Sequence, residues 1–414
     1  MNSNTNSPVV KQLVLLGGGH SHLAVLKQFG MNPVPGLALT LISADIETPY
    51  SGSLPGYISG IYDRDEIHID LRPLAQFAGA RLIQSEITRI DFEQKIIHCE
   101  GRPTINFDFI SLNIGSKPNA IKIPGASEFA IGIKPIDRFL IHWQQLYSDM
   151  LSAIGSEKKS YRFMIVGGGP ASVELAFAVQ QRIHNELKIK DYENSPLKIG
   201  IVTADKEVLK FHNSKVRHFV KAEFVTREIE VFLEHEVIEF GAGKIYCDNE
   251  RLIEADTMIY ATGASISSWP EECGLAIGED GFIEVNDFLQ STSHEFVFAA
   301  GDAATIKGHP RPKSGVYAVR QGKPLAENLQ RFATAKNLKP YSPQKHALAL
   351  INLGNKKAIA SRHNFFFQGR SVWSLKHSID TSFIRKYNQF PVMPDNFEIA
   401  KGLVSDAAEQ QLRK

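Results

Sequence analysis

Two short apolar runs along the chain each end in a cluster of glycines. The runs cover residues 13–16 and 163–166, and three glycines follow each of them. Each cluster opens a segment with helical apolar spacing, and a second apolar run follows it, at residues 38–43 and 197–203. A strand, a glycine turn, a helix and a second strand form a β-α-β unit, so the pattern predicts two such units in an α/β chain.

Further apolar segments extend this organisation. Three of them end in small residues and are predicted strands: 109–115, 257–263 and 295–301. Alternating segments between about residues 64 and 107, among them 80–83 and 95–98, predict a β-meander. A helix is predicted over 134–153, where large apolar residues recur at helical spacing. It is expected to link the two units.

The pattern changes from about Tyr341 onward. Strand-like segments flank a turn at Gly354, and an amphipathic stretch follows over 372–387. One face of that stretch carries Val372, Leu375, Ile379 and Phe383, while Lys376, Arg385 and Lys386 lie elsewhere. We expect this face to dock on the protein itself, with peripheral membrane contact as the alternative.

Composition narrows the classes of function. The formal net charge is +1, which gives no basic field for nucleic acid. The three cysteines, Cys99, Cys247 and Cys273, form no close-spaced pair, so neither a disulfide framework nor a redox pair is expected. No apolar run has the length of a transmembrane helix. A cytoplasmic protein is expected, with peripheral contact at the inner membrane face as an alternative.

The glycine clusters predict dinucleotide sites. In G-x-G-x-x-G the first glycine permits a tight turn, the second lets a pyrophosphate approach the backbone, and the helix N-terminus favours the phosphates. Gly17 and Gly19 fill the first two positions of one loop, and Gly167 and Gly169 fill those of the other. The third position holds His22 and Ser172, respectively. Because two imperfect loops occur in the same context, we expect two dinucleotide sites.

Both units lack the acid that usually ends the second strand and binds the ribose hydroxyls. Ser43 and Thr203 stand there instead, and Asp45 and Asp205 follow two residues later. A missing carboxylate removes repulsion against a 2′-phosphate, so NADH and NADPH both stay candidates.

A third marker is the apolar strand that ends at Gly301-Asp302. Taken alone, Asp302 is better explained as a helix N-cap. After two glycine loops and an Ala261-Thr262-Gly263 strand end, it indicates a flavin site.

Five segments, 17–23, 48–56, 113–118, 315–322 and 373–376, carry a resemblance to known flavoproteins. They resemble the pyridine nucleotide–disulfide oxidoreductase superfamily, whose members have two dinucleotide-binding domains. The chain looks closest to the branch of type II NADH dehydrogenases and sulfide:quinone oxidoreductases, and closer still to a subfamily often fused to selenide, water dikinase. The kinase domain has no counterpart here.

The resemblance implies FAD in the first unit and NADH or NADPH in the second. It implies that Gly301 and Asp302 bind the ribityl and phosphate region of FAD, that Gly263 lies beside the nicotinamide nucleotide, and that Glu174 lies near the nicotinamide ribose. The candidate FAD residues are Gly17, Gly19, His20, Ser21, His22, Ser43, Tyr50, Ser51, Gly115, Gly301 and Asp302. The candidate NAD(P) residues are Gly167, Gly169, Pro170, Ala171, Glu174, Thr203 and Gly263.

Other side chains have competing explanations. His20 and His22 point to different faces of a helix, so a shared metal is not expected, and packing is as good an explanation as contact with the FAD phosphate. Tyr50 and Ser51 lie in a proline-bounded loop that could reach the isoalloxazine or be merely structural. Lys313 and Gln321 are candidates for the acceptor side.

The expected fold is α/β, with two Rossmann-like domains of three-layer ββα type, the second inserted in the first, and a smaller C-terminal domain. The predicted boundaries are as follows: FAD domain 9–125 and 285–345, linker helix 126–154, NAD(P) domain 155–284, C-terminal domain 346–400 and tail 401–414. The expected activity is transfer of hydride from NAD(P)H to FAD and of electrons onward to a quinone or another small acceptor. The alternatives are a slow redox-sensing flavoprotein and a flavin enzyme of selenium or sulfur chemistry.

Overall fold

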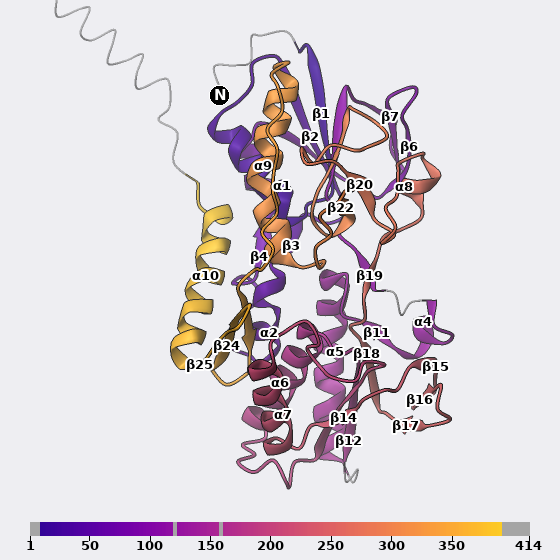
Figure 1. Cartoon of the computed structure of the whole chain (residues 1–414), viewed down its shortest axis with the longest axis vertical. Helices are drawn as coiled ribbons and strands as arrows, with labels where there is room; N and C mark the ends of the chain where they lie inside the picture. Colours follow the sequence, from indigo (N-terminus) through magenta and orange to yellow (C-terminus); the bar gives the residue numbers. More distant parts are fainter. Residues whose placement is uncertain (1–8, 119–121, 157–159, 391–414) are drawn as a thin grey trace, which may run out of the picture.

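Two parallel sheets of five strands, one in each half of the molecule, form the centre of the fold (Figure 1). The computed structural model describes residues 9–118, 122–156 and 160–390. The first sheet has the order β21 (Val297–Ala299), β9 (Phe109–Leu112), β1 (Lys11–Leu16), β2 (Leu37–Ser43) and β5 (Ala80–Gln84). Its central strand is apolar and buried from Leu13 to Leu16, as expected for a parallel sheet covered on both faces.

The second sheet repeats this order around its own glycine strand. It runs β11 (Ile131–Gly132), β18 (Thr257–Tyr260), β12 (Tyr161–Val166), β13 (Leu197–Val202) and β14 (Glu230–Phe232). Thus β1 lies between β2 and β9, and β12 lies between β13 and β18. The two predicted β-α-β units and the α/β fold class are confirmed.

Each glycine strand leads into the helix that crosses to the second strand. These helices are α1 (His20–Met31) and α6 (Pro170–Glu186). α1 packs along α9 (Gly315–Ala333), where a Cβ on Gly322 would lie 2.6 Å from the Ala24 Cβ, so glycine permits this close contact. The other long helices of the two halves are α3 (Leu71–Phe77), α5 (Ile136–Gly155) and α7 (Ser214–Thr226).

The predicted meander is partly wrong. Residues 80–83 belong to β5, which pairs parallel with β2, because α3 returns the chain to the sheet edge. The meander that remains consists of β6 (Ile87–Asp91), β7 (Ile96–Cys99) and β8 (Ile105–Asn106). The second half has a matching meander of β15 (Val237–Gly241), β16 (Lys244–Cys247) and β17 (Leu252–Glu254).

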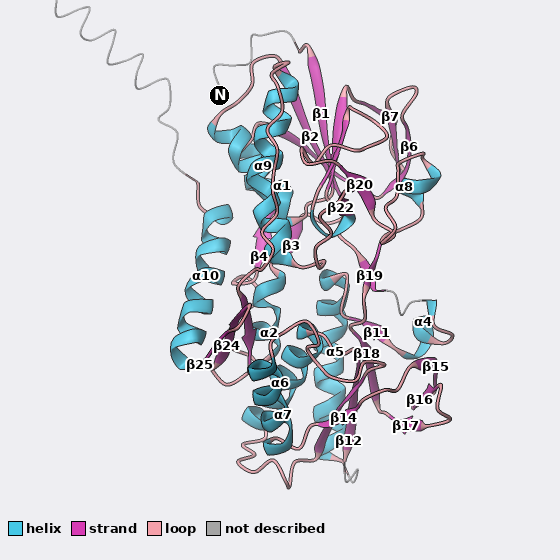
Figure 2. Cartoon of the chain, viewed as in Figure 1, coloured by secondary structure: helices cyan, strands magenta, loops and turns pink. Residues whose placement is uncertain are grey.

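Two adjacent segments join the halves. β10 (Lys117–Pro118) leaves the first half and pairs antiparallel with β19 (Ala264–Ser265), which returns to it (Figure 2). Leu275 and Ile283 already pack in the core of the first half, so the return precedes the expected boundary at 285. The strand β11 pairs with β18, so the second sheet likewise includes residues that were assigned to the linker.

A C-terminal unit lies against both halves. It consists of the antiparallel strands β23 (Ala349–Asn352), β24 (Ala358–Arg362) and β25 (Phe365–Gly369), followed by α10 (Arg370–Asn388). Ile359 of β24 joins the core of the second half, while Tyr387 of α10 joins that of the first. The predicted end of this domain and the tail, 391–414, lie outside the described residues.

The helix α10 docks on the protein, but only partly through the face that its apolar pattern predicts. Val372 is buried and Phe383 packs against the core of the first half, whereas Leu375 and Ile379 are 47% and 43% exposed. The docking side is turned relative to the predicted face, because the charged pair of Lys376 and Asp380 is buried there.

Short elements complete the described chain. They are β3 (Glu47–Pro49), η1 (Ser51–Ser53), α2 (Leu54–Ile58), β4 (His68–Asp70), α4 (Ala126–Phe129), α8 (Trp269–Glu272), β20 (Ile283–Val285), η3 (Gly301–Ala303) and β22 (Ala304–Ile306). Within the described ranges, no helix combines the length and hydropathy needed to cross a bilayer.

Candidate functional site

The first glycine loop is built around Asn113, at the end of β9. A Cβ on Gly17, whose φ is +89°, would lie 2.5 Å from the Asn113 carbonyl oxygen, and one on Gly19 would lie 2.3 Å from Asn113 Oδ1. That same Oδ1 accepts from Ser21 N at 3.0 Å, while Nδ2 donates to the Ala300 carbonyl at 2.8 Å. Asn113 thus joins three segments of the predicted site. It was not among the predicted site residues, although it begins the 113–118 segment that carried the resemblance.

His22 is a structural part of this loop. Its Nδ1 lies 2.7 Å from the Gly17 carbonyl and its Nε2 lies 2.9 Å from Ser111 Oγ, and the side chain is fully buried. Burial lowers the pKa of His22 to about 4, against the Gly17 hydrogen bond, which raises it. A neutral ring that braces the turn fits the packing explanation, because neither ring nitrogen is left for a phosphate.

His20 faces the other way and has an unused polar atom. Its Nε2 is buried and has no hydrogen-bond partner among the described residues. Burial lowers the pKa of His20 to about 4, partly offset by Asp302. The ring lies edge-on to Tyr50 at 5.5 Å between centroids, and Tyr50 stacks on Phe383 of α10 at 4.3 Å. The neighbouring Ser51 lies against Gly315, at the start of α9.

The Gly301–Asp302 turn lies beside this loop. Gly301 has a φ of +71°, and its N–H donates to Gln321 Oε1 at 2.6 Å. Lys134 Nζ lies 2.6 Å from Asp302 Oδ2, and Ser116 Oγ donates to the same oxygen at 3.2 Å. No described residue donates to Asp302 Oδ1, so one oxygen of this carboxylate remains free for a ligand hydroxyl.

The two acceptor-side candidates lie at this turn. Gln321 is buried and holds the Gly301 N–H. Lys313 donates to the Ala304 carbonyl at 2.6 Å and lies over the Phe282 ring. Both residues line the same small hollow as Gly301 and Asp302. These contacts brace the turn, and the role of the two residues at the acceptor stays a prediction.

The second loop has the same course but more open surroundings. Gly167 has a φ of +125°, and its Cβ would lie 2.8 Å from the Ala261 carbonyl oxygen. A Cβ on Gly169 would meet no atom within 4 Å. Pro170 and Ala171, the first residues of α6, are exposed, as is Gly263 beyond β18. The predicted nucleotide residues therefore surround an open helix N-terminus.

Hydroxyl side chains occupy the positions of the missing ribose acids in both halves. Ser43 Oγ lies 3.2 Å from the Cβ position of Gly18, and Thr203 Oγ1 lies 2.9 Å from that of Gly168. The carboxylate of Asp205, two residues after Thr203, pairs with Lys210 at 2.6 Å.

A second polar cluster joins α6, α10 and the loop after β3. Lys376 Nζ donates to Asp380 Oδ2 at 2.8 Å and to the Gly52 carbonyl at 2.6 Å. Glu174 Oε1 accepts from Asn352 N at 2.7 Å, so this carboxyl, expected near the nicotinamide ribose, contacts the C-terminal sheet. Burial raises the pKa of Glu174 to about 7, with Lys376 opposing the rise. Burial likewise raises the pKa of Asp380.

Comparison with known proteins agrees with this geometry. Residues 11–322 match the family model described as pyridine nucleotide-disulphide oxidoreductase. The chain belongs to the pyridine nucleotide-disulphide oxidoreductase family. It is therefore a flavin-dependent oxidoreductase of the NAD(P)H-using type.

Individual relatives are distant. The chain is 23% identical over 354 residues to the NADH dehydrogenase-like protein YutJ of Bacillus subtilis, covering 84% of this chain and 91% of the relative. It is 26% identical to the demethylphylloquinone reductase NdbB of Synechocystis, covering 75% and 79%. The structure of NDH2 from Plasmodium falciparum in complex with NADH superposes with a TM-score of 0.77 at 17% identity, covering 92% and 99%. This likeness confirms the fold.

The family name includes a disulphide, but the cysteines of this chain are free. Cys99 and Cys247 are buried and Cys273 is partly buried. Burial raises the pKa of the Cys99 and Cys247 thiols, which disfavours the reactive thiolate.

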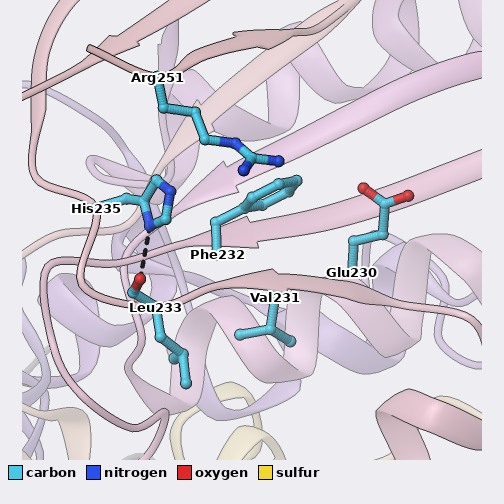
Figure 3. A pocket seen from close by; sticks show the side chains of 6 residues that line it. All are labelled: Glu230, Val231, Phe232, Leu233, His235 and Arg251. Carbon is cyan, nitrogen blue, oxygen red and sulfur yellow. Dashed lines mark hydrogen bonds between the residues drawn. The ribbon is translucent and has the colours of Figure 1, made fainter. Parts of the chain in front are cut away.

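One surface hollow was not anticipated from the sequence. It lies beside the edge strand β14, where Arg251 reaches over the ring of Phe232 and His235 bonds to the Leu233 carbonyl (Figure 3). None of the predicted cofactor residues lines it. It adjoins the second loop at Thr203, whose N–H donates to the Phe232 carbonyl and whose carbonyl accepts from the His235 N–H.

Proposed function

We propose that this protein is an FAD-dependent NAD(P)H dehydrogenase that passes electrons to a quinone. The observation that carries the proposal is the pair of glycine loops at equivalent ends of two like sheets in one chain. Two dinucleotides bound at such loops can bring a nicotinamide and a flavin together.

The first loop fits FAD. Gly17 and Gly19 give the backbone approach, and the N–H groups of Gly19 and His20 have no acceptor among the described residues. Asp302 Oδ1 and His20 Nε2 have no partner among the residues that the structure describes, and both suit a ligand rich in hydroxyl and phosphate oxygens. FAD bound there would supply the hydride acceptor.

The second loop fits the nicotinamide nucleotide. The open space at Gly169 and the exposed start of α6 leave room for a pyrophosphate. The protein's part in hydride transfer is to hold the two rings in contact and exclude water, which requires no nucleophilic side chain.

The cluster of Glu174, Lys376 and Asp380 suits an acceptor that takes up protons. Quinone reduction consumes two protons with its two electrons, whereas hydride transfer to a flavin needs no side-chain proton donor. Glu174, with its pKa near 7, can hold or release a proton close to neutral pH, and Lys376 lies in the same cluster. The name of the Synechocystis relative, a demethylphylloquinone reductase, supports the same class of acceptor.

Separate half-reactions test this assignment. In Glu174→Gln, we expect flavin reduction by NAD(P)H to stay within about threefold and flavin reoxidation by a soluble quinone to fall by about tenfold or more. Since Glu174 carries its proton below about pH 7, wild-type reoxidation should slow as the pH rises through that value, and the variant should lose this step.

Glu186→Gln, an exposed carboxylate on the same helix, is the matched control. Equal reoxidation by Glu174→Gln and wild type would contradict the role of the cluster. If NAD(P)H reduces the flavin but no quinone reoxidises it, the acceptor assignment fails, and slow redox sensing or sulfur and selenium acceptors become the candidates.

The C-terminal unit supports peripheral contact with an anionic membrane as part of this function. Residues 345–390 contain eight Lys or Arg side chains and a single acid, Asp380, although the whole chain has a net charge of only +1. Phe365 and Phe367 of β25 are 57% and 54% exposed. Exposed aromatic residues beside basic ones are typical of a surface that binds anionic lipid.

Vesicle binding tests that contact. The protein should sediment with vesicles of phosphatidylcholine and phosphatidylglycerol, and less with phosphatidylcholine alone. Replacing Phe365 and Phe367 by serine should weaken binding, whereas Ile141→Ser, a change of a 74% exposed residue of α5, should not. If the double variant of Phe365 and Phe367 bound the vesicles as strongly as the control variant, the assigned surface would be contradicted.

A further inference from the structure

Lys134 reaches from the second sheet into the flavin half. It comes two residues after β11, which pairs with β18 of the second sheet. Its ammonium group nevertheless lies 2.6 Å from Asp302 Oδ2 and 3.3 Å from Ser116 Oγ. The two side chains are 31% and 14% exposed, so the pair is partly buried.

The two donors that contact the Asp302 carboxylate bind the same one of its oxygens. Lys134 and Ser116 both bind Oδ2, and Oδ1 has no donor among the described residues. A carboxylate fixed by one oxygen presents the other in a constant direction. His20 lies within electrostatic reach of both Asp302 and Lys134, and its buried Nε2 lacks a partner. Groups from three distant segments therefore meet at one place, and two of them have an unused polar atom.

A purely structural ion pair is the simpler explanation. Partly exposed pairs contribute little to stability, with about 0–1 kcal/mol typical of surface pairs. That explanation accounts for the contact between the halves. It does not account for two polar atoms that lack a partner among the described residues, Asp302 Oδ1 and His20 Nε2.

We infer that Lys134 is a positioning residue of the flavin site, contributed by the second half of the molecule. It holds the Asp302 carboxylate so that Oδ1 faces the ribityl chain, and its positive charge favours the reduced cofactor. Flavin binding then depends on how the two halves are arranged. This inference rests on the proposed binding of FAD at the first loop.

Reconstitution of flavin-free protein tests the inference. In Lys134→Met, FAD affinity should fall by about tenfold or more, as expected when a charge-assisted contact is lost. Lys134→Arg should stay within about threefold of wild type, because it keeps the charge and a donor. Lys117→Met, an exposed lysine of β10, is the control and should match wild type.

Two further readouts separate positioning from a structural role. The melting temperature of flavin-free Lys134→Met should match that of wild type. At a fixed potential, the ratio of reduced to oxidised flavin should fall about tenfold in Lys134→Met, which equals about 30 mV for a two-electron couple.

Three outcomes would overturn the inference. The first is unchanged FAD affinity and redox ratio in Lys134→Met. The second is a loss of FAD affinity in Lys134→Met together with a lower melting temperature of the flavin-free variant. The third is an FAD affinity of Lys134→Arg as low as that of Lys134→Met. A wild-type protein that binds no FAD would instead refute the proposed function, so the two failures are distinguishable.

Discussion

The two glycine loops follow the same path but differ in what their glycines contact. In the first loop, a Cβ on Gly19 would meet the Asn113 side chain at 2.3 Å, and His22 fills the space beneath the turn. In the second loop, a Cβ on Gly169 would meet no protein atom within 4 Å. Packing thus requires glycine at position 19 of the first loop, whereas at the equivalent position 169 of the second only a ligand would require it. A shared motif can therefore have different physical causes in its two copies.

The largest effect should follow Gly19→Ala. The new methyl group would displace Asn113, which holds Ser21 N and the Ala300 carbonyl, so overpacking and broken hydrogen bonds act together. We expect a loss of roughly 1–3 kcal/mol in the free energy of unfolding, and loss of flavin. Denaturant unfolding measures the loss of stability, and the ratio of FAD to protein measures the loss of flavin. Wild-type stability in this variant would show that the first loop is as open as the second.

Gly169→Ala should separate stability from ligand binding. Gly169 has a φ of −83°, which alanine adopts freely, so stability should hold or rise by about 0.4–1 kcal/mol. The methyl group should obstruct the pyrophosphate and raise the NAD(P)H concentration for half-maximal flavin reduction by about tenfold or more. Stopped-flow reduction provides this value, with Gly155→Ala, another glycine in open space, as the control. An unchanged half-maximal concentration would place the nucleotide elsewhere.

The smallest effect should be a difference in acid sensitivity. His22 braces the first loop as a neutral ring with a pKa of about 4, whereas Ser172 holds that position in the second. The unfolded chain binds the proton near pH 6.5, so the native state loses stability as the pH falls from about 6.5 to about 4. His22→Gln should flatten this part of the stability profile, measured by denaturant unfolding across that range. A profile parallel to that of wild type would indicate that the pKa of His22 is the same in the native and unfolded protein.

The architecture was predictable because it depends on local patterns. Apolar runs that end in glycine clusters give the two β-α-β units, and the Gly301–Asp302 strand end lies beside the first loop as the pattern suggested. The place of residues 80–83 in the sheet was not predictable, because a short strand in a parallel sheet and a short strand in a meander show similar alternation of apolar and polar residues. Only the pairing of β5 with β2 distinguishes them.

The contacts that complete the site depend on residues far apart in the chain. Lys376 bonds to the carbonyl of Gly52, 324 positions away, and Lys134 bonds to Asp302, 168 positions away. Hydrophobic periodicity placed Lys376 off the apolar face of its helix, and its burial depends in part on the distant Gly52 carbonyl, which the local sequence does not indicate. The 373–376 segment gave the one available signal, its resemblance to a flavoprotein subfamily.

The visible spectrum of the purified protein shows whether it binds a flavin that NAD(P)H can reduce. The proposed function predicts a yellow protein with one FAD per chain, whose flavin absorption bleaches when NADH or NADPH is added without oxygen and returns when a quinone is supplied. A protein that stays colourless after reconstitution with FAD, or a bound flavin that neither nucleotide reduces, would contradict it.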